Sequence, residues 1–367
     1  VVFSYSDVSN QKVMTASSVA MSAGANFMLL GPGDTMLKSN KPVISICATR
    51  TGSGKSQTTR YVANILKEQG YKVGIIRHPM PYGNLVKQKM QRFTTIEDLD
   101  KYDCTIEERE EYEPHIRNGF IVYAGVDYKA ILTEAEKDTD IILWDGGNND
   151  IPFYSPDIHI VVTDPHRAGD ELTYYPSQLN LRMADIVVIN KVDTADYESV
   201  AIVRQNVKAV NPDAKIVEAA SPIEVDKPEL IFGKKVVVVE DGPTLTHGEM
   251  GFGAGILAAE RFGATEIVEP YDYAKGSLKA TLDKYDHLGP LLPAMGYYPE
   301  QVEELRQSLE DTPAETVITA TPIDLSRLFK LTKPIVRVKY ELQVIGKPTL
   351  QELISPVVKE WITQKQR

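Results

Sequence analysis

The chain has little of what marks secreted, membrane-spanning or nucleic-acid-binding proteins. Only two of its 367 residues are cysteines, Cys47 and Cys104, so the sequence supports neither a disulfide framework nor a cysteine-based metal site. No run of about 18 apolar residues is present, which argues against a membrane-spanning helix. The net charge of −11 would repel phosphate backbones and anionic surfaces. We therefore expect a cytoplasmic protein that binds neither membranes nor nucleic acids.

What is present is an ordinary globular composition, with 43% apolar and 25% charged residues, arranged as two series of alternating strands and helices. The first series, within residues 41–228, predicts an α/β domain with a doubly wound parallel sheet. The second series predicts a Rossmann-like α/β domain over residues 229–345, after a joint near residues 226–233. Residues 346–367 are expected to form a C-terminal tail.

The first 40 residues read as a strand, a helix and a second strand, at residues 1–5, 13–23 and 27–30. A β-α-β piece of that size cannot easily cover its own apolar faces. We expect residues 1–40 to be the C-terminal fragment of an N-terminal Rossmann-like domain. A processed or truncated N-terminus is the equally open alternative.

Residues 49–56 (Thr-Arg-Thr-Gly-Ser-Gly-Lys-Ser) predict a phosphate-binding P-loop, because they follow an apolar strand and open an amphipathic helix. Backbone N–H groups and the helix N-terminus would hold phosphate oxygens. Lys55 would reach the β and γ phosphates, and the Ser56 hydroxyl would bind Mg²⁺. The nucleotide contacts expected here are Thr51, Gly52, Ser53, Gly54, Lys55, Ser56 and Gln57. The alternative is a glycine-rich turn without a ligand; Thr49 replaces the usual first glycine, and Arg50 takes a position that some P-loop proteins fill with lysine.

A second magnesium ligand is expected at the end of a neighbouring strand. The apolar strand at residues 141–145 ends in Asp145, and a carboxylate at that point of a P-loop protein holds the metal directly or through water. Asp164, which ends the next strand, is the rival candidate.

The tetrapeptide Asn190-Lys191-Val192-Asp193 ends a further strand and predicts recognition of guanine. The Asp193 carboxylate can accept hydrogen bonds from the guanine N1–H and 2-amino group, which adenine does not offer. Asn190 would address the base, and Lys191 would pack over its face. The alternative is a plain turn at the end of a strand.

Substrate contacts are expected at two further places. Arg77 and His78 follow a strand at its carboxyl end, where open α/β sheets bind ligands. In the second half, residues 240–255 form a glycine-rich stretch before a helix, in which Thr246, His247 and Gly248 could bind an anion and His247 could transfer a proton. A merely tight connection is the alternative there. The acidic stretch at residues 107–115 is expected to be a solvated helix face.

These motifs together resemble a known family. The phosphate loop, with Arg50 at the extra-lysine position, resembles that of SIMIBI-class P-loop proteins. From Lys41 to about Tyr340 the chain is similar to archaeal and bacterial proteins of the cyclic 2,3-diphosphoglycerate synthetase or "predicted GTPase" family. The matching segments are residues 77–83, 144–150, 164–167, 190–193, 241–255 and 292–296. Members have a further N-terminal Rossmann-like domain, in agreement with the expectation for residues 1–40.

The resemblance implies an enzyme that uses GTP or ATP with Mg²⁺ for phosphoryl chemistry on a small phosphorylated acid. Lys55, Arg50, Asp145 and His247 would be its catalytic residues, with Arg50 and Lys55 neutralising charge in the transition state. Related proteins reach phosphates across a dimer from the position of Arg50, so a homodimer is expected. The alternative is a GTPase switch or metallochaperone without a small-molecule product, although the histidine- or cysteine-rich tracts of a metallochaperone are missing.

Overall fold

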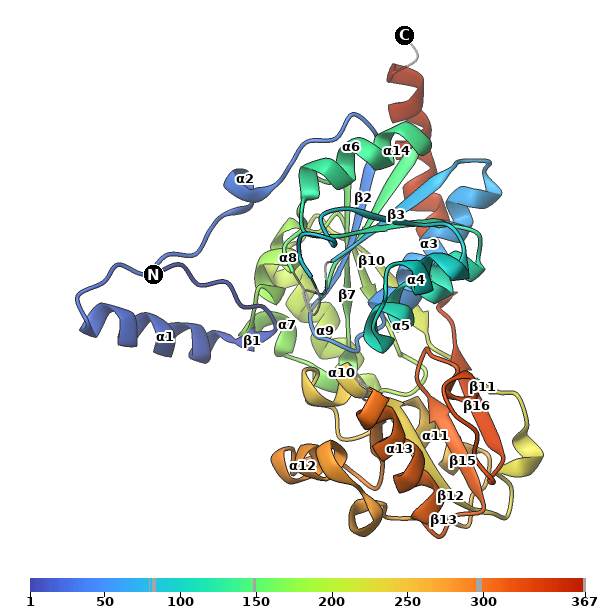
Figure 1. Cartoon of the computed structure of the whole chain (residues 1–367). Coiled ribbons are helices and arrows are strands. Elements are labelled where there is room, and N and C mark those ends of the chain that lie inside the picture. Colours follow the sequence, from blue (N-terminus) through green and yellow to red (C-terminus); the bar gives the residue numbers. More distant parts are fainter. Residues whose placement is uncertain (79, 81–83, 148–149, 295–298, 366–367) are drawn as a thin grey trace. The chain divides into compact units, whose positions relative to one another are not determined.

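The computed structural model describes residues 1–78, 80, 84–147, 150–294 and 299–365 of the chain (Figure 1). The chain divides into two compact units. The first contains Val1–Asp98, His115–Ser221 and Leu342–Arg367, and the second contains Leu99–Pro114 and Pro222–Glu341. This division differs from the expected boundaries in three ways. Leu99–Pro114 belongs to the second unit, and the longer stretch of that unit begins at Pro222, seven residues before residue 229. The stretch expected to be a tail belongs to the first unit.

The first unit is built on a nine-stranded sheet. Its strands, in spatial order, are β17 (Gln343–Ile345), β10 (Lys215–Ala220), β9 (Ile186–Ile189), β7 (Ile158–Thr163), β2 (Val43–Ala48), β6 (Ile141–Asp145), β3 (Val73–Arg77), β5 (Ile121–Ala124) and β4 (Gln91–Phe93). The two edge strands, β17 and β4, are antiparallel to their neighbours, and all other pairs are parallel. The parallel strands therefore end at one common edge of the sheet.

Helices cover both faces of this sheet, which explains why its central strands are apolar without alternation. One face packs against α3 (Lys55–Glu68) and α14 (Leu350–Lys365). The other face packs against α6 (Tyr128–Asp138), α8 (Ser177–Met183) and α9 (Tyr197–Val210). The prediction of a doubly wound α/β domain is confirmed.

Residues 1–40 form less regular structure than the sequence predicts. The helix is present as α1 (Asn10–Ser22), but the two expected strands are reduced to a single parallel bridge between Val2 and Met28. The short strand β1 (Val8–Ser9) instead pairs with β8 (Tyr174–Tyr175), so this segment attaches to the first unit. Whether it is the end of a further domain stays a prediction.

The second unit is also α/β, as expected. Its sheet follows the order β11 (Ile223–Val225), β16 (Ile335–Tyr340), β15 (Thr316–Ala320), β12 (Lys235–Asp241) and β13 (Glu266–Ile267), with β14 (Leu292–Ala294) also paired to β12. Its faces pack against α11 (Ala254–Arg261) on one side and against α12 (Gly276–Lys284) and α13 (Pro299–Asp311) on the other. A 3₁₀ turn, Leu325–Arg327, follows β15.

Candidate nucleotide site

The P-loop connects β2, the central strand of the first unit, to α3. Gly54, which caps α3, has φ +104°, in the left-handed region that favours glycine. A Cβ at this position would also collide with the side-chain amides of Asn190 and Gln57. Inside the loop, the Ser53 N–H and hydroxyl both donate to the Arg50 carbonyl oxygen, at 3.2 and 2.8 Å. The glycine is therefore required by backbone conformation and by packing together.

Asp145 lies at the centre of a buried charge network beside the loop. Its Oδ1 is 2.5 Å from Lys55 Nζ, and its Oδ2 is 2.5 Å from Arg77 Nη1. Burial of this fully enclosed carboxylate acts to raise its pKa, but the Arg77 and Lys55 charges outweigh burial and hold the pKa well below its usual value. Two predicted site residues, Lys55 and Arg77, thus meet the predicted metal ligand.

His115 completes this network and was not predicted. Its Nε2 lies 3.2 Å from Asp145 Oδ2, and burial lowers the pKa of the imidazole despite the opposing effect of Asp145. His115 lies on α5 (Ile106–Arg117), where Glu108 and Glu110 are also buried. The expectation of a solvated helix face over residues 107–115 is therefore wrong. The sequence marks the start of this helix, through the capping box of Thr105 and Glu108, but not its burial.

On the other side of the loop, a second network supports its backbone. Asn190 Nδ2 donates to the Ser53 carbonyl oxygen at 2.9 Å, and Lys191 Nζ donates to the Gly52 carbonyl oxygen at 2.7 Å. Asp164 Oδ2 in turn accepts from Lys191 Nζ at 2.8 Å and from Arg167 Nη2 at 2.8 Å. Burial acts to raise the Asp164 pKa, but Lys191 and Arg167 hold it far below its usual range. Asp164 thus reaches the loop through Lys191 and Arg167, which donate to loop carbonyl oxygens, whereas Asp145 pairs directly with Lys55.

The other residue of the guanine motif is exposed. Asp193 Oδ1 accepts a hydrogen bond from the Ser221 backbone N–H at 2.9 Å. The Ser221 hydroxyl donates to Gln57 Oε1 at 3.1 Å, so the ends of β9 and β10 are tied to the third residue of α3. Ser56, the expected metal-binding hydroxyl, precedes Gln57 on that helix. The roles of Asp193, Gln57 and Ser56 toward a nucleotide stay predictions.

Arg50 is enclosed by groups of its own chain. Its guanidinium pairs with Asp7 (Nε–Oδ1 2.8 Å) and with Asp170 on α7 (Asp170–Thr173), and it stacks over the Tyr174 ring with Cζ 3.6 Å from the ring centroid. Asp7 also accepts from the Thr51 backbone N–H at 3.0 Å and from the Thr51 hydroxyl at 2.6 Å. The predicted contact of Arg50 with phosphate is not tested by this arrangement. No sequence motif marked Asp7 or Asp170.

His78 pairs with a carboxylate that the sequence reasoning did not single out. Its Nδ1 lies 2.5 Å from Asp150 Oδ2, and Asp150 Oδ1 accepts from the Ser6 hydroxyl at 2.9 Å. Parts of the segments that carry the family resemblance, namely residues 79, 81–83, 148–149 and 295–296, lie outside the described residues.

The second candidate anion loop has a different arrangement from the expected one. Thr246 ends α10 (Gly242–Thr246), its hydroxyl lies 3.1 Å from His247 Nδ1, and the Gly248 N–H donates to the Pro243 carbonyl oxygen. At the start of α11, the Ile256 N–H donates to Glu240 Oε1 at 2.9 Å. The group at this helix N-terminus is thus the chain's own carboxyl side chain. Roles for Thr246, His247 and Gly248 in substrate binding stay predictions.

Burial raises the pKa of Glu240 to about 8, although backbone N–H groups of Ile256, Gly255 and Gly253 act to lower it. A carboxyl group with that pKa is largely protonated at neutral pH. It fills the helix N-terminus with little net charge.

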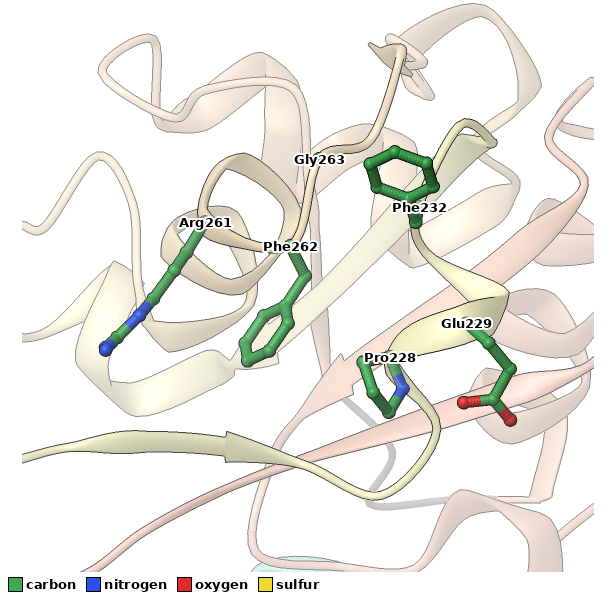
Figure 2. Close-up of a pocket in the computed structure, with 6 residues that line it drawn as sticks. All are labelled: Pro228, Glu229, Phe232, Arg261, Phe262 and Gly263. Atoms are coloured by element: carbon green, nitrogen blue, oxygen red, sulfur yellow. The ribbon is translucent and has the colours of Figure 1, made fainter.

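A surface hollow of about 400 Å³ in the second unit contains none of the predicted site residues. Figure 2 shows its lining, in which the rings of Phe232 and Phe262 lie on two separate segments. Among the described residues, no group of three or more His, Cys, Asp or Glu side chains could hold a metal ion. None of the described helices has the length and apolar character needed to cross a membrane.

Comparison with known proteins places these motifs in a family. A family model described as the P-loop domain of cyclic 2,3-diphosphoglycerate synthetase matches residues 117–220. The arginine synthetase ArcE of Thermococcus kodakarensis is 62% identical over 361 residues, which cover 98% of this chain and 80% of ArcE. A cyclic 2,3-diphosphoglycerate synthetase of Pyrococcus furiosus is 26% identical over 195 residues, covering 48% of this chain and 44% of that relative.

Among solved structures, LpxK from Aquifex aeolicus, crystallised with ATP, superposes with a TM-score of 0.55. The match covers 95% of this chain and 98% of LpxK at 14% sequence identity. At that identity the likeness establishes the fold alone, which agrees with the doubly wound sheet described above.

Proposed function

We propose a function for this chain from its family: it belongs, with the arginine synthetase ArcE and the cyclic 2,3-diphosphoglycerate synthetases, to a family of P-loop synthetases. We propose that it is an NTP-dependent ligase that forms arginine. The observation that carries this proposal is the 62% identity to ArcE over 98% of the chain. The relatives that act on diphosphoglycerate match about half of the chain at lower identity.

The chemistry of arginine formation suits a phosphate loop. The guanidinium carbon of arginine carries three nitrogens, and citrulline is the amino acid with the same skeleton in which one oxygen replaces one of them. Transfer of the γ-phosphoryl group to that ureido oxygen would turn it into a leaving group. Ammonia would then form the C–N bond, the C–O bond would break, and phosphate would leave with the electron pair. Citrulline, ammonium and NTP are thus converted to arginine, NDP, phosphate and one proton.

The residues around the loop have the chemistry that these steps require. The helix N-terminus and the N–H groups of residues 51–57 would hold the phosphates. Lys55 would leave Asp145 and contact the β and γ phosphates, where it balances the charge of a loose transition state. Ser56 and Asp145 would hold Mg²⁺; a hydroxyl and one carboxylate, completed by phosphate oxygens, fit the few protein ligands that Mg²⁺ takes in such sites. Bound Mg²⁺ supplies further neutralisation of phosphate charge.

GTP is the proposed nucleotide, with ATP as the alternative. Asn190 and Lys191 bind the backbone of the phosphate loop, and Asp193, two residues after Lys191, is exposed. The Asp193 carboxylate is therefore accessible to a guanine base. Contacts of Arg77, His78, Thr246, His247 and Gly248 with substrate are part of the proposal. We also propose a cytoplasmic location and a homodimer in which Arg50 contacts the phosphates bound by the partner subunit.

A second candidate is phosphoryl chemistry on a small phosphorylated acid, which the match of residues 117–220 to the diphosphoglycerate synthetase model favours. A GTPase switch or metallochaperone, the third, would cleave NTP without a small-molecule product.

One set of incubations separates these candidates. The protein with Mg²⁺ and either GTP or ATP is given citrulline with ammonium, or 2,3-diphosphoglycerate, and NDP and products are measured by mass spectrometry. We expect arginine to form in equal amount to NDP, and Lys55→Met to abolish both. A cyclic diphosphoglycerate product would establish the second candidate, and NTP cleavage that responds to neither compound would leave the switch.

A further inference from the structure

The pair formed by His78 and Asp150 is built as a proton acceptor. His78 Nδ1 lies 2.5 Å from Asp150 Oδ2, so one ring nitrogen is in contact with the carboxylate. No second partner of the His78 ring is present among the described residues, and the side chain is 30% exposed, so Nε2 is available to a ligand. Asp150 is itself held through its other oxygen by the Ser6 hydroxyl. A histidine oriented by a carboxylate through one nitrogen can accept a proton at the other.

The ring is held in place by packing as well. A Cβ added to Gly147 would lie 2.5–2.8 Å from three atoms of the His78 ring, so the chain after β6 passes directly against the imidazole. The ring of Phe153 is a second neighbour, with ring centroids 6.3 Å apart. Both neighbours limit rotation of the side chain, which is what a group that must meet a reacting atom requires.

The pair also lies on the phosphate side of the sheet. His78 directly follows β3 and Asp150 follows the strand end of β6, the two strands that bring Arg77 and Asp145 to Lys55. The Asp150 backbone carbonyl oxygen accepts from the thiol of Cys47 on β2, at 3.3 Å. Burial acts to raise the pKa of Asp150, but the contacts with His78 and Ser6 and the charge of Lys55 together lower it. Lys55 is therefore close enough to act on the pair.

We propose that His78 accepts the proton of the nucleophile in the phosphate-loop reaction, and that Asp150 is the positioning residue that holds its ring. This inference rests on the proposed ligase function and names the acid–base group of that site. Ammonium cannot attack while all its electron pairs are used in N–H bonds. His78 Nε2 would remove one proton, the freed electron pair would form the C–N bond, and phosphate would leave from the same carbon.

Among the described residues, the charged and titratable groups that interact with Asp150 include Lys55, the Cys47 thiol and the Tyr128 hydroxyl. Asp145 interacts with Cys47 in turn. Burial and, less, Asp150 raise the pKa of Tyr128 to about 12. Burial keeps the Cys47 pKa far above its usual value, so neither the thiol nor the phenol loses its proton near neutral pH. A pH dependence of the rate that is lost in H78Q would then report on the His78 side chain, not on the thiol or the phenol.

The test compares the full chain with H78Q, H78A and D150N under saturating Mg·NTP, citrulline and ammonium. We expect H78Q to lower kcat by about 10²- to 10⁴-fold at unchanged nucleotide affinity. The wild-type rate should rise with pH over the histidine range, and the H78Q rate should not. D150N should move the midpoint of the rise to lower pH, because a carboxylate beside the ring favours its protonated form. Added imidazole should restore part of the H78A rate.

D213N, at an exposed aspartate without an assigned contact, is the matched control for D150N and should behave as wild type. Wild-type kcat and an unaltered pH profile in H78Q would overturn the proposal, as would failure of imidazole to restore a folded, nucleotide-binding H78A. NTP cleavage is followed beside arginine. If the wild type cleaves NTP without forming arginine, the ligase function fails, and the same variants then decide whether His78 accepts the proton of attacking water.

Discussion

At the scale of single residues, Asp145 sets the charge of the candidate site. One fully buried carboxylate faces two cations, Lys55 and Arg77, each 2.5 Å from one of its oxygens. Taking charges out of water is costly unless partners compensate, so this group stabilises the edge of the sheet only as an intact set. Two cations face one carboxylate, so the site has an excess of positive charge. A bound triphosphate would balance that excess.

Asp145→Asn removes the negative charge that faces both cations. We expect the free energy of unfolding to fall by about 3–5 kcal/mol at pH 7, the cost of breaking a buried ion pair on one side. The Asp145 pKa is lower in the folded state, so its contribution is present above the unfolded pKa of about 4 and is lost as pH falls below it. Urea unfolding at pH 7 and pH 3 measures both effects. A difference from wild type that is the same at both pH values would contradict this assignment, and D213N serves as the control.

At the scale of elements, strand ends were predictable and helix partners were not. The strand β6 ends at Asp145 as its apolar run indicates, and the helix expected at residues 13–23 is present as α1. The same patterns do not reveal what an acidic helix packs against, so the burial of Glu110 and His115 on α5 was missed. The glycines before α11 suggested an external anion for the same reason: nothing in the pattern says that Glu240, from the preceding strand, fills the helix N-terminus.

Glu240→Gln tests this internal cap through pH. The folded state holds the Glu240 proton more tightly than the unfolded state, because its pKa rises from 4.5 to about 8. Wild-type stability should therefore fall as pH rises from 4.5 to 8, by an upper bound of roughly 5 kcal/mol. Glutamine resembles the protonated acid and lacks this loss, so the stability of E240Q relative to wild type should increase over that range. Thermal unfolding at pH 5, 6.5 and 8 measures it. E260Q, an exposed change on α11, the helix that Glu240 caps, should show no such trend. If E240Q also shows no change relative to wild type over this pH range, the pKa of Glu240 is not raised.

At the scale of the whole molecule, local patterns gave the class of each unit but not the limits between them. Two alternating series predicted two α/β units, and both are present. The return of residues 342–367 to the first unit depends on the pairing of β17 with β10, more than 100 residues apart in the chain, and no local signal encodes such a pairing. The residues of the candidate site were predictable to the same extent: those in local motifs were found, and those brought in by distant pairing were not. Motif residues such as Lys55 and Asn190 were found, whereas Asp7, Asp150 and Asp170 became visible only through their spatial neighbours.

The choice of nucleotide by the whole enzyme tests the guanine interpretation. Asp193→Asn replaces two acceptor positions for the guanine N1–H and 2-amino group by an amide that can donate to the 2-oxo group of xanthine. We expect the preference for GTP over XTP to fall by about 10- to 150-fold, the range for a hydrogen bond to a charged group. The ratio of kcat/KM for GTP, XTP and ATP measures this change. If the ratio of kcat/KM for GTP to that for XTP is the same in D193N and wild type, Asp193 does not contact the base. A wild-type preference for ATP would lead to the same conclusion.

The contacts that hold the phosphate loop have a consequence for the order of folding. Thr51 is bonded to Asp7, 44 residues earlier, and to Arg167, 116 residues later, while Ser53 is bonded to Asn190 across 137 residues. Closing such long loops costs chain entropy before any contact compensates for it. The loop therefore reaches its final shape only after the strands on both sides of β2 have assembled. Competence to bind nucleotide should be among the last properties that the refolding chain acquires.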